Sequence, residues 1–160
     1  MRVTLAAIGR ARDEPEAQLF EQYWKRAARL GPRLGFTGFD IAIVENSRRN
    51  TAPERCREEA ERLTRRLPAD AQLIVLDERG RSLTSHEFAK LFSQWRDRGI
   101  DDVVFVIGGP DGLSPDFRSF AQLQFAFGAQ TWPHLLVRAM LAEQIYRALT
   151  ILSGHPYHRA

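Results

Sequence analysis

The last residues of the chain hold its densest group of reactive side chains. His155, Tyr157, His158 and Arg159 stand within the final six positions. Imidazoles transfer protons, phenols stack on bases, and guanidinium groups bind phosphate. A polar terminus can also be frayed and inert, and terminal histidines can come from an affinity tag, which the intervening Pro156-Tyr157 does not resemble. The segment is a candidate for catalysis through its histidines and Tyr157, and for substrate contact through Arg159.

A glycine-rich turn, Gly108-Gly109-Pro110-Asp111-Gly112, follows the apolar run 103–107. Glycines allow backbone to approach a ligand closely and to present free N–H groups to it. The turn is not a P-loop, because no Gly-Lys-Ser/Thr follows, and it is not a GxGxxG dinucleotide fingerprint. An ordinary turn between a strand and a helix would have the same composition.

Arg138 is a third candidate, near the start of an expected helix over 133–152. At helical spacing it shares a face with apolar residues such as Ala142 and Ile145, whereas Arg147 points to the opposite side. Near the helix N-terminus its guanidinium could bind an anion with help from the helix dipole, or it could extend to solvent. Polar residues on opposed faces indicate a helix buried on more than one side, which dimerisation would supply. Glu143 stands four residues before Arg147, in the orientation that favours an ion pair.

The elements that must position these groups alternate along the chain. Apolar runs predict strands at 3–8, 36–44, 73–76, 103–107 and 125–129. Helical spacing predicts helices at 15–30, 53–67, 82–98, 116–123 and 133–152. This alternation predicts an α/β fold with a mostly parallel sheet, in a single domain over 1–160. Ligands of such sheets bind beyond the carboxyl ends of the strands, so Leu76-Asp77, 108–112 and 128–133 should meet there.

Charge and composition set further bounds. The net charge is +3, and of the 23 basic residues only Lys25 and Lys90 are lysines. Arginine suits phosphate and hence nucleic acid, although a genome rich in arginine codons would produce the same bias. The polar loop 45–52 carries Arg48 and Arg49. The sequence shows no signal peptide and no apolar stretch long enough for a membrane span, and its single cysteine cannot form an intramolecular disulfide, so we expect a cytoplasmic protein.

Four short motifs in the second half of the chain together resemble those of a known family. They are Gly108-Gly109-Pro110-x-Gly112, Pro133-His134-x-Leu136-Val137-Arg138, Glu143-Gln144-x-Tyr146-Arg147-Ala148, and His155-Pro156-Tyr157-His158-Arg159. In this order they resemble the bacterial 23S ribosomal RNA (pseudouridine-N3) methyltransferase family of the SPOUT superfamily. The resemblance covers the whole chain, and its specific part lies from the glycine-rich turn onward.

The resemblance implies a parallel-sheet fold whose C-terminal segment forms a trefoil knot, and a homodimer whose partner completes each pocket. It implies S-adenosylmethionine as cofactor, no metal, and transfer of its methyl group to N3 of a pseudouridine. By matching position, the cofactor would be held by Leu76, Gly108, Gly109, Gly128, Ala129, Gln130, Thr131, Trp132 and Pro133. Trp132 departs from the smaller apolar residue more usual in the family.

The N3 proton must leave during this reaction, so we expect a base or a group that stabilises the anion. The catalytic candidates are His155, Tyr157, His158 and Arg138, and the candidates for substrate contact are Arg159, Arg48 and Arg49. Because the charge excess is small, attraction to RNA phosphates should be weak. We therefore expect the substrate to be the assembled ribosome, which presents a pre-formed target. The alternatives are a SPOUT methyltransferase for another RNA position and a non-catalytic ribosome- or nucleotide-binding module.

Overall fold

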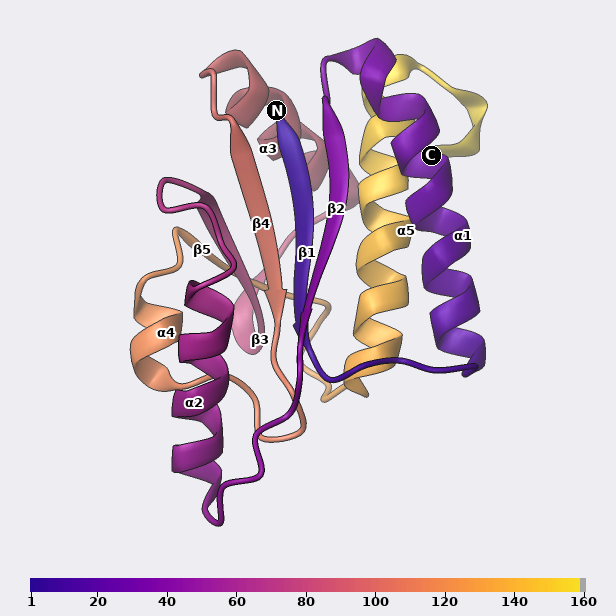
Figure 1. The fold of residues 1–160 in the computed structure, drawn as a ribbon. Coiled ribbons are helices and arrows are strands. Elements are labelled where there is room, and N and C mark those ends of the chain that lie inside the picture. Colours follow the sequence, from indigo (N-terminus) through magenta and orange to yellow (C-terminus); the bar gives the residue numbers. More distant parts are fainter. Residues whose placement is uncertain (159–160) are drawn as a thin grey trace.

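A computed structural model describes residues 1–158 of the chain, and its centre is a five-stranded, wholly parallel sheet (Figure 1). The strand order is β2-β1-β4-β3-β5. The strands are β1 (Arg2–Ile8), β2 (Gly38–Val44), β3 (Gln72–Ser82), β4 (Asp102–Ile107) and β5 (Leu123–Ala126). The prediction of an α/β fold with a parallel sheet is confirmed.

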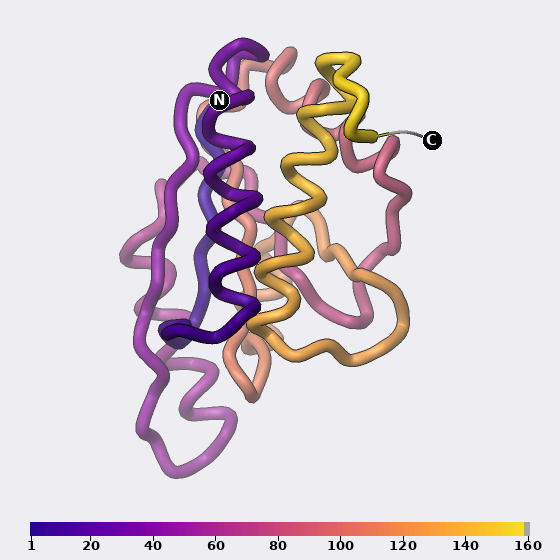
Figure 2. The backbone as a smooth tube through the Cα atoms, turned by 90° about the vertical axis from the view of Figure 1, so that its right-hand side faces the viewer, coloured from indigo at the N-terminus to yellow at the C-terminus, as the bar shows by residue number. Residues whose placement is uncertain are grey.

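Helices cover both faces of this sheet. One face carries α1 (Pro15–Leu30), α3 (Ser85–Asp97) and α5 (His134–Ser153), and the other carries α2 (Ala52–Thr64) and the short α4 (Pro115–Ser119). Figure 2 shows α1 and α5 running side by side, and α3 packs against α5 as well. Two short 3-10 segments, Gly31–Leu34 and Pro156–His158, complete the described chain.

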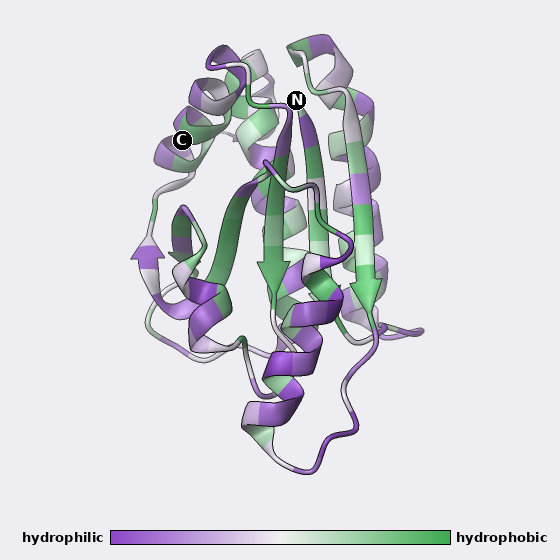
Figure 3. Ribbon diagram, turned by 60° about the vertical axis from the view of Figure 1, so that its left-hand side comes forward, coloured by the Kyte–Doolittle hydropathy of each residue, from purple (hydrophilic) through white to green (hydrophobic). Residues whose placement is uncertain are grey.

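The hydropathy pattern explains this layering. The central strands β1 and β4 are almost wholly buried, as expected for continuous apolar runs in a parallel sheet covered on both sides. Figure 3 shows their hydrophobic character beside the hydrophilic outer surface of α2. Every residue of α5 before Ser153 is buried or half-buried, because the sheet, α1 and α3 surround it. Its burial on more than one side is therefore largely supplied within one chain, without a second copy.

The ends of several predicted elements were wrong, and hydrogen bonds give the reason in two cases. The third helix begins at Ser85 and not at Ser82, because Thr84 is its N-cap and forms a capping box with Glu87. Thr51 and Glu54 form the equivalent box at the start of α2. The second strand starts at Gly38, α2 ends at Thr64, α4 ends at Ser119 and the fifth strand ends at Ala126.

The largest error concerns β3, which was expected to end at Asp77. It pairs with β4 only as far as Leu76, but extended backbone continues through the polar residues to Ser82. Arg81 and Ser82 pair with Phe125 and Ala126 of β5, after a register shift. Apolar periodicity cannot reveal this extension, because backbone hydrogen bonds to a partner strand create it.

Candidate functional site

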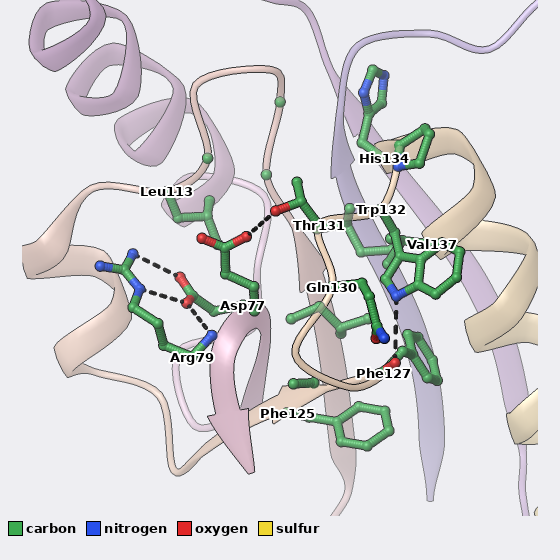
Figure 4. Close-up of a pocket in the computed structure, with 18 of the residues that line it drawn as sticks. Asp77, Arg79, Leu113, Phe125, Phe127, Gln130, Thr131, Trp132, His134 and Val137 are labelled. Atoms are coloured by element: carbon green, nitrogen blue, oxygen red, sulfur yellow. Dashed lines mark hydrogen bonds and ion pairs between the residues drawn. The ribbon is translucent and has the colours of Figure 1, made fainter. Parts of the chain in front are cut away.

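Three connecting segments meet at the carboxyl ends of the strands and enclose a cleft of about 460 Å³ (Figure 4). They are residues 76–79 after the apolar part of β3, 107–113 after β4, and 125–134 with Val137 at the start of α5. The predicted meeting of these strand ends is confirmed. A cleft of this size lies within the ~300–1,000 Å³ range of small-molecule sites.

Most of the residues assigned to the cofactor from the sequence line this cleft. They are Leu76, Gly108, Gly109, Gly128, Gln130, Thr131, Trp132 and Pro133. Ala129 is the exception, since it is exposed beside the cleft and does not line it. The structure adds lining residues that sequence reasoning did not assign, among them Asp77, Glu78, Arg79, Asp111, Phe127, His134 and Val137.

The glycines of the 108–112 turn are required by the turn itself. A Cβ at Gly108 would lie 2.7 Å from the backbone carbon of Gly112, and the N–H of Gly112 donates to the carbonyl of Gly109 at 2.9 Å. A Cβ at Gly109 would point toward Ile8, at 3.1 Å from its Cγ2, and so away from the cleft. The glycines therefore bring the two sides of the turn together, and the turn lines the cleft.

Side-chain hydrogen bonds shape the segment between β5 and α5. Thr131 Oγ1 donates to Glu78 Oε2 at 2.6 Å, which ties this segment to the end of β3. Trp132 Nε1 donates to the carbonyl of Phe127 at 3.4 Å, and Gly128 adopts a φ of +104° that favours glycine. Figure 4 shows Thr131 and Trp132 leaving the segment in different directions. Trp132 is 39% exposed, whereas the other two tryptophans are buried in the core.

Asp77 supplies a half-buried carboxylate at one wall of the cleft. Its oxygens accept from Arg118 of α4 at 2.7 Å and from Arg79 at 3.1 Å. This network positions the segment that follows Leu76 and joins it to α4. The sequence signal for it was the acidic residue that ends the apolar run 73–76, but the arginine partners could not be found by spacing.

His134 begins α5 and lines the cleft beside Pro133. Burial, and secondarily the charge of Arg138, lower the pKa of its imidazole below the ordinary value. The ring is therefore neutral at pH 7. Its place in the Pro133-His134 motif was the available sequence signal.

Arg138 is buried at 4% exposure, so the alternative that it extends to solvent is wrong. Its NH2 donates to the carbonyls of Ile8 at 2.6 Å and Gly9 at 2.9 Å, at the end of β1. Burial lowers the pKa of this guanidinium from its ordinary value. Within one chain Arg138 joins α5 to β1 next to the glycine-rich turn, and it does not line the cleft.

The tail lies at the other end of α5 (Figure 1). The tail turns back along the helix, so that Tyr157 reaches Glu143 near its middle. None of residues 155–158 lines the cleft of the same chain. His155, Tyr157 and His158 lie in or beside the Pro156–His158 turn, and Arg159 lies outside the described residues. The described part of the tail is folded, so it is not a frayed end.

Tyr157 anchors this tail. Its hydroxyl donates to Glu143 Oε1 at 3.0 Å and lies 3.3 Å from the hydroxyl of Tyr23. Arg147 pairs with Glu143 at 2.6 Å, as predicted, and its guanidinium carbon lies 5.0 Å from the centre of the Tyr157 ring. Burial raises the pKa of the Tyr157 phenol well above its ordinary value, and the bond to Tyr23 and the Glu143 charge add to the shift. The phenol therefore stays protonated at neutral pH and acts as a hydrogen-bond donor.

Arg48 and Arg49 are exposed in the loop between β2 and α2, which lies beyond the carboxyl ends of the strands (Figure 1). Arg49 Nε lies 3.7 Å from Glu58. Residues 1–158 contain no group of three or more His, Cys, Asp or Glu side chains that could hold a metal, and no helix in this range is long and apolar enough to cross a membrane.

Comparison with known proteins gives consistent matches. The family described as Predicted SPOUT methyltransferase matches residues 1–158. The chain is 52% identical, over 100% of both chains, to "Ribosomal RNA large subunit methyltransferase H" of Rhodopseudomonas palustris (strain BisB18). It is 50% identical, over 99% of both, to the protein of the same name from Nitrobacter winogradskyi. A solved structure of a probable methylase family protein from Haemophilus influenzae Rd KW20 has a similar fold, with a TM-score of 0.50 and 11% identity, covering 99% of this chain and 70% of that one.

Proposed function

The chain belongs to the SPOUT methyltransferase family, and from that premise we propose that it methylates N3 of a pseudouridine in large-subunit (23S) ribosomal RNA, with S-adenosylmethionine as methyl donor. The observation that carries the proposal is the 52% identity to a ribosomal RNA large subunit methyltransferase, which extends over the full length of both chains.

The cleft has the chemistry that S-adenosylmethionine requires. Apolar side chains of Leu76, Phe127 and Val137 form part of its wall and suit the adenosine. The backbone of the 108–112 turn and of the segment 128–133 brings polar groups into the same cleft, which suit the methionine part. These residues would hold the cofactor, which supplies the methyl group as a sulfonium.

The chain's own residues must orient the pseudouridine and accept its N3 proton. Correct positioning of donor and acceptor can be worth about 7–11 kcal/mol. The N3 proton has to leave, and we assign its removal to His155 or His158. Tyr157 serves as a donor and a packing surface, since its phenol stays protonated. Arg138 holds the end of β1 beside the glycine-rich turn and does not line the cleft, so its positive charge would favour an anionic base only at a distance.

This division of labour requires a homodimer. The cleft lies at the start of α5, whereas the tail packs on its C-terminal half and does not line the cleft of the same chain, so the tail of one copy would reach the cleft of the other for both to act on one base. Light scattering at micromolar concentration should give twice 18.3 kDa. A monomeric mass would contradict the shared site.

The proposal includes the organisation of the chain as one domain over 1–160 with a C-terminal trefoil knot. Turns that are far apart in sequence, at 76–79, 107–113 and 125–134, meet in one cleft, which is the arrangement a knotted cofactor site needs. The contact of Thr131 with Glu78 joins the last of these segments to the first.

We further propose that the substrate is the assembled ribosome, with Arg48, Arg49 and Arg159 contacting its RNA. A net charge of +3 gives weak attraction to phosphates at physiological salt. The loop between β2 and α2, which carries the exposed Arg48 and Arg49, extends past the carboxyl ends of the strands (Figure 1), where a docked surface would meet it. Methylation of assembled ribosomes should exceed that of protein-free 23S RNA containing the same pseudouridine, and equal rates would contradict docking on a pre-formed surface.

Tritium transfer from labelled S-adenosylmethionine to ribosomes, followed by mapping of the modified base, tests the function directly. Label at N3 of a pseudouridine is the expected result. Label at another nucleotide would establish a different RNA target. Cofactor binding without transfer to any ribosomal RNA would establish a non-catalytic module.

A further inference from the structure

One side chain joins the glycine-rich turn of the cleft to the arginine-bearing loop before α2. Arg55, in the first turn of α2, makes a two-point contact with Asp111 at the tip of the turn. Its Nε donates to Asp111 Oδ2 at 2.7 Å, and its NH2 donates to Oδ1 at 3.0 Å. Because two nitrogens of the planar guanidinium bind the two carboxylate oxygens, the contact fixes the orientation of Asp111 relative to Arg55 as well as their distance.

The remaining nitrogen of the same guanidinium faces the loop between β2 and α2. Arg55 NH1 donates to the carbonyls of Arg49 and Asn50, both at 3.1 Å. Every nitrogen of the Arg55 guanidinium is therefore bonded, to the cleft turn on one side and to loop backbone on the other. A lysine could not make these contacts together, because its ammonium is a single point on a flexible stem.

Further contacts attach α2 to the loop on one side of Arg55 and to the glycine-rich turn on the other. Ser47, in the loop, donates its N–H to the buried carboxylate of Glu59 at 2.7 Å, and its hydroxyl donates to Glu58. The Sγ of Cys56 lies 3.5 Å from the carbonyl of Asp111. Asp111 itself lines the cleft, and the bond to Arg55 holds its pKa below the ordinary value, so the pair is charged at neutral pH.

We propose that Arg55 is a positioning residue that holds the glycine-rich turn in its cofactor-binding shape and keeps it in register with loop 45–51. It contacts no reacting atom. Without it, the turn retains its glycines but loses its outer attachment, so the turn samples shapes that do not bind cofactor. This inference rests on the proposed function of the cleft.

Arg55→Gln, Arg55→Lys and Asp111→Asn are compared with the wild type for binding of S-adenosylhomocysteine by calorimetry. We expect Arg55→Gln and Asp111→Asn each to weaken binding about tenfold, equivalent to ~1.4 kcal/mol. The double variant should be no weaker than either single one, because both remove the same contact. Arg55→Lys should restore binding only in part. KM for the cofactor should rise while kcat on ribosomes changes little.

Arg57→Gln is the matched control. Arg57 is on the same helix, is exposed, and forms no ion pair or side-chain hydrogen bond within residues 1–158. It should bind as the wild type does. A purely structural role of Arg55 would lower the melting temperature and leave the affinity of the folded fraction unchanged, and that result, or unchanged KM, would overturn the inference. If the wild type itself fails to bind S-adenosylhomocysteine, the proposed function fails instead.

Discussion

The two ends of α5 differ in how their polar groups are used. At the start of the helix, His134 and Val137 face a cleft, and Arg138 is committed to backbone carbonyls of β1. In its C-terminal half, Glu143 and Arg147 contact each other and Tyr157 of the tail, which turns back along the helix. The cleft at the start of the helix is formed largely by the connecting segments that follow the strands. The cluster around Tyr157 consists of side chains that contact one another and does not line this cleft. Neither end alone holds both a cofactor-sized cleft and the reactive side chains, which is why we propose that the two act together across copies.

The strongest test of this comparison removes the tail. Deleting residues 155–160 should reduce methyl transfer at least about 100-fold, since general acid–base groups contribute ~10²–10⁴. S-adenosylhomocysteine affinity should stay within a small factor, because the cleft lies at the other end of α5. Tritium transfer and calorimetry measure the two quantities. Near-normal turnover would show that the tail has no part in the reaction.

A second test uses a substitution, Gln130→Trp, that fills part of the cleft and leaves the fold intact. Gln130 is exposed, lines the cleft and makes no side-chain hydrogen bond within the described chain, so Gln130→Trp adds bulk there at little structural cost. Cofactor affinity should fall about 10–100-fold. Gly109 is less suitable for this test, because its Cβ would push toward Ile8. Calorimetry gives the affinity, and an unchanged melting temperature confirms folding.

Mixing these two variants tests whether the two ends cooperate between copies. Tail-deleted and Gln130→Trp chains, each with little activity, should form hybrid dimers that contain one intact cleft facing one intact tail. After co-refolding at equal amounts, activity should recover to about a quarter of the wild-type value, because half the dimers are hybrids with one working site each. Activity equal to the average of the two separate variants would place cleft and tail of one chain in the same site.

Trp132 offers a smaller, spectroscopic effect at the cleft end. It is the one tryptophan at the cleft, and Trp24 and Trp95 are buried at 6% and 5% exposure. Addition of S-adenosylhomocysteine should change the fluorescence of the wild type, and Trp132→Phe should abolish the change while binding persists by calorimetry. A response that survives in Trp132→Phe would mean that the signal comes from the core.

The smallest expected effect is the pH dependence of stability from His134. Its folded-state pKa lies below the ordinary value of about 6.5, so the unfolded chain binds more protons just below that pH. Stability should therefore be fully present above pH ~6.5 and fall as the pH drops toward the folded-state pKa. His134→Asn should flatten this slope in urea melts at several pH values. Glu59, whose pKa burial raises, contributes an opposite slope in both proteins, so the difference isolates His134.

The sequence alone determined the order of elements, the parallel α/β class and the segments of the cleft. The reason is local: apolar runs such as 103–107 must be buried, and strand ends must lie at one edge of a parallel sheet. Motif resemblance supplied the family and the nine residues that we assign to the cofactor, of which Ala129 alone does not line the cleft. It could not supply the length of β3, because pairing of Arg81 and Ser82 with β5 defines that strand.

Only the tertiary structure decided how the charged groups are used. Arg138 looked free to bind an anion or reach solvent, but β1 ends beside it and offers two carbonyls. Arg55 carried no signal, since its partner Asp111 lies 56 residues away. The sequence made Tyr157 a candidate for catalysis, but in the fold its hydroxyl contacts Glu143 and Tyr23. Burial follows from composition along the chain, whereas hydrogen-bond partners depend on which distant segments the fold brings within about 3 Å.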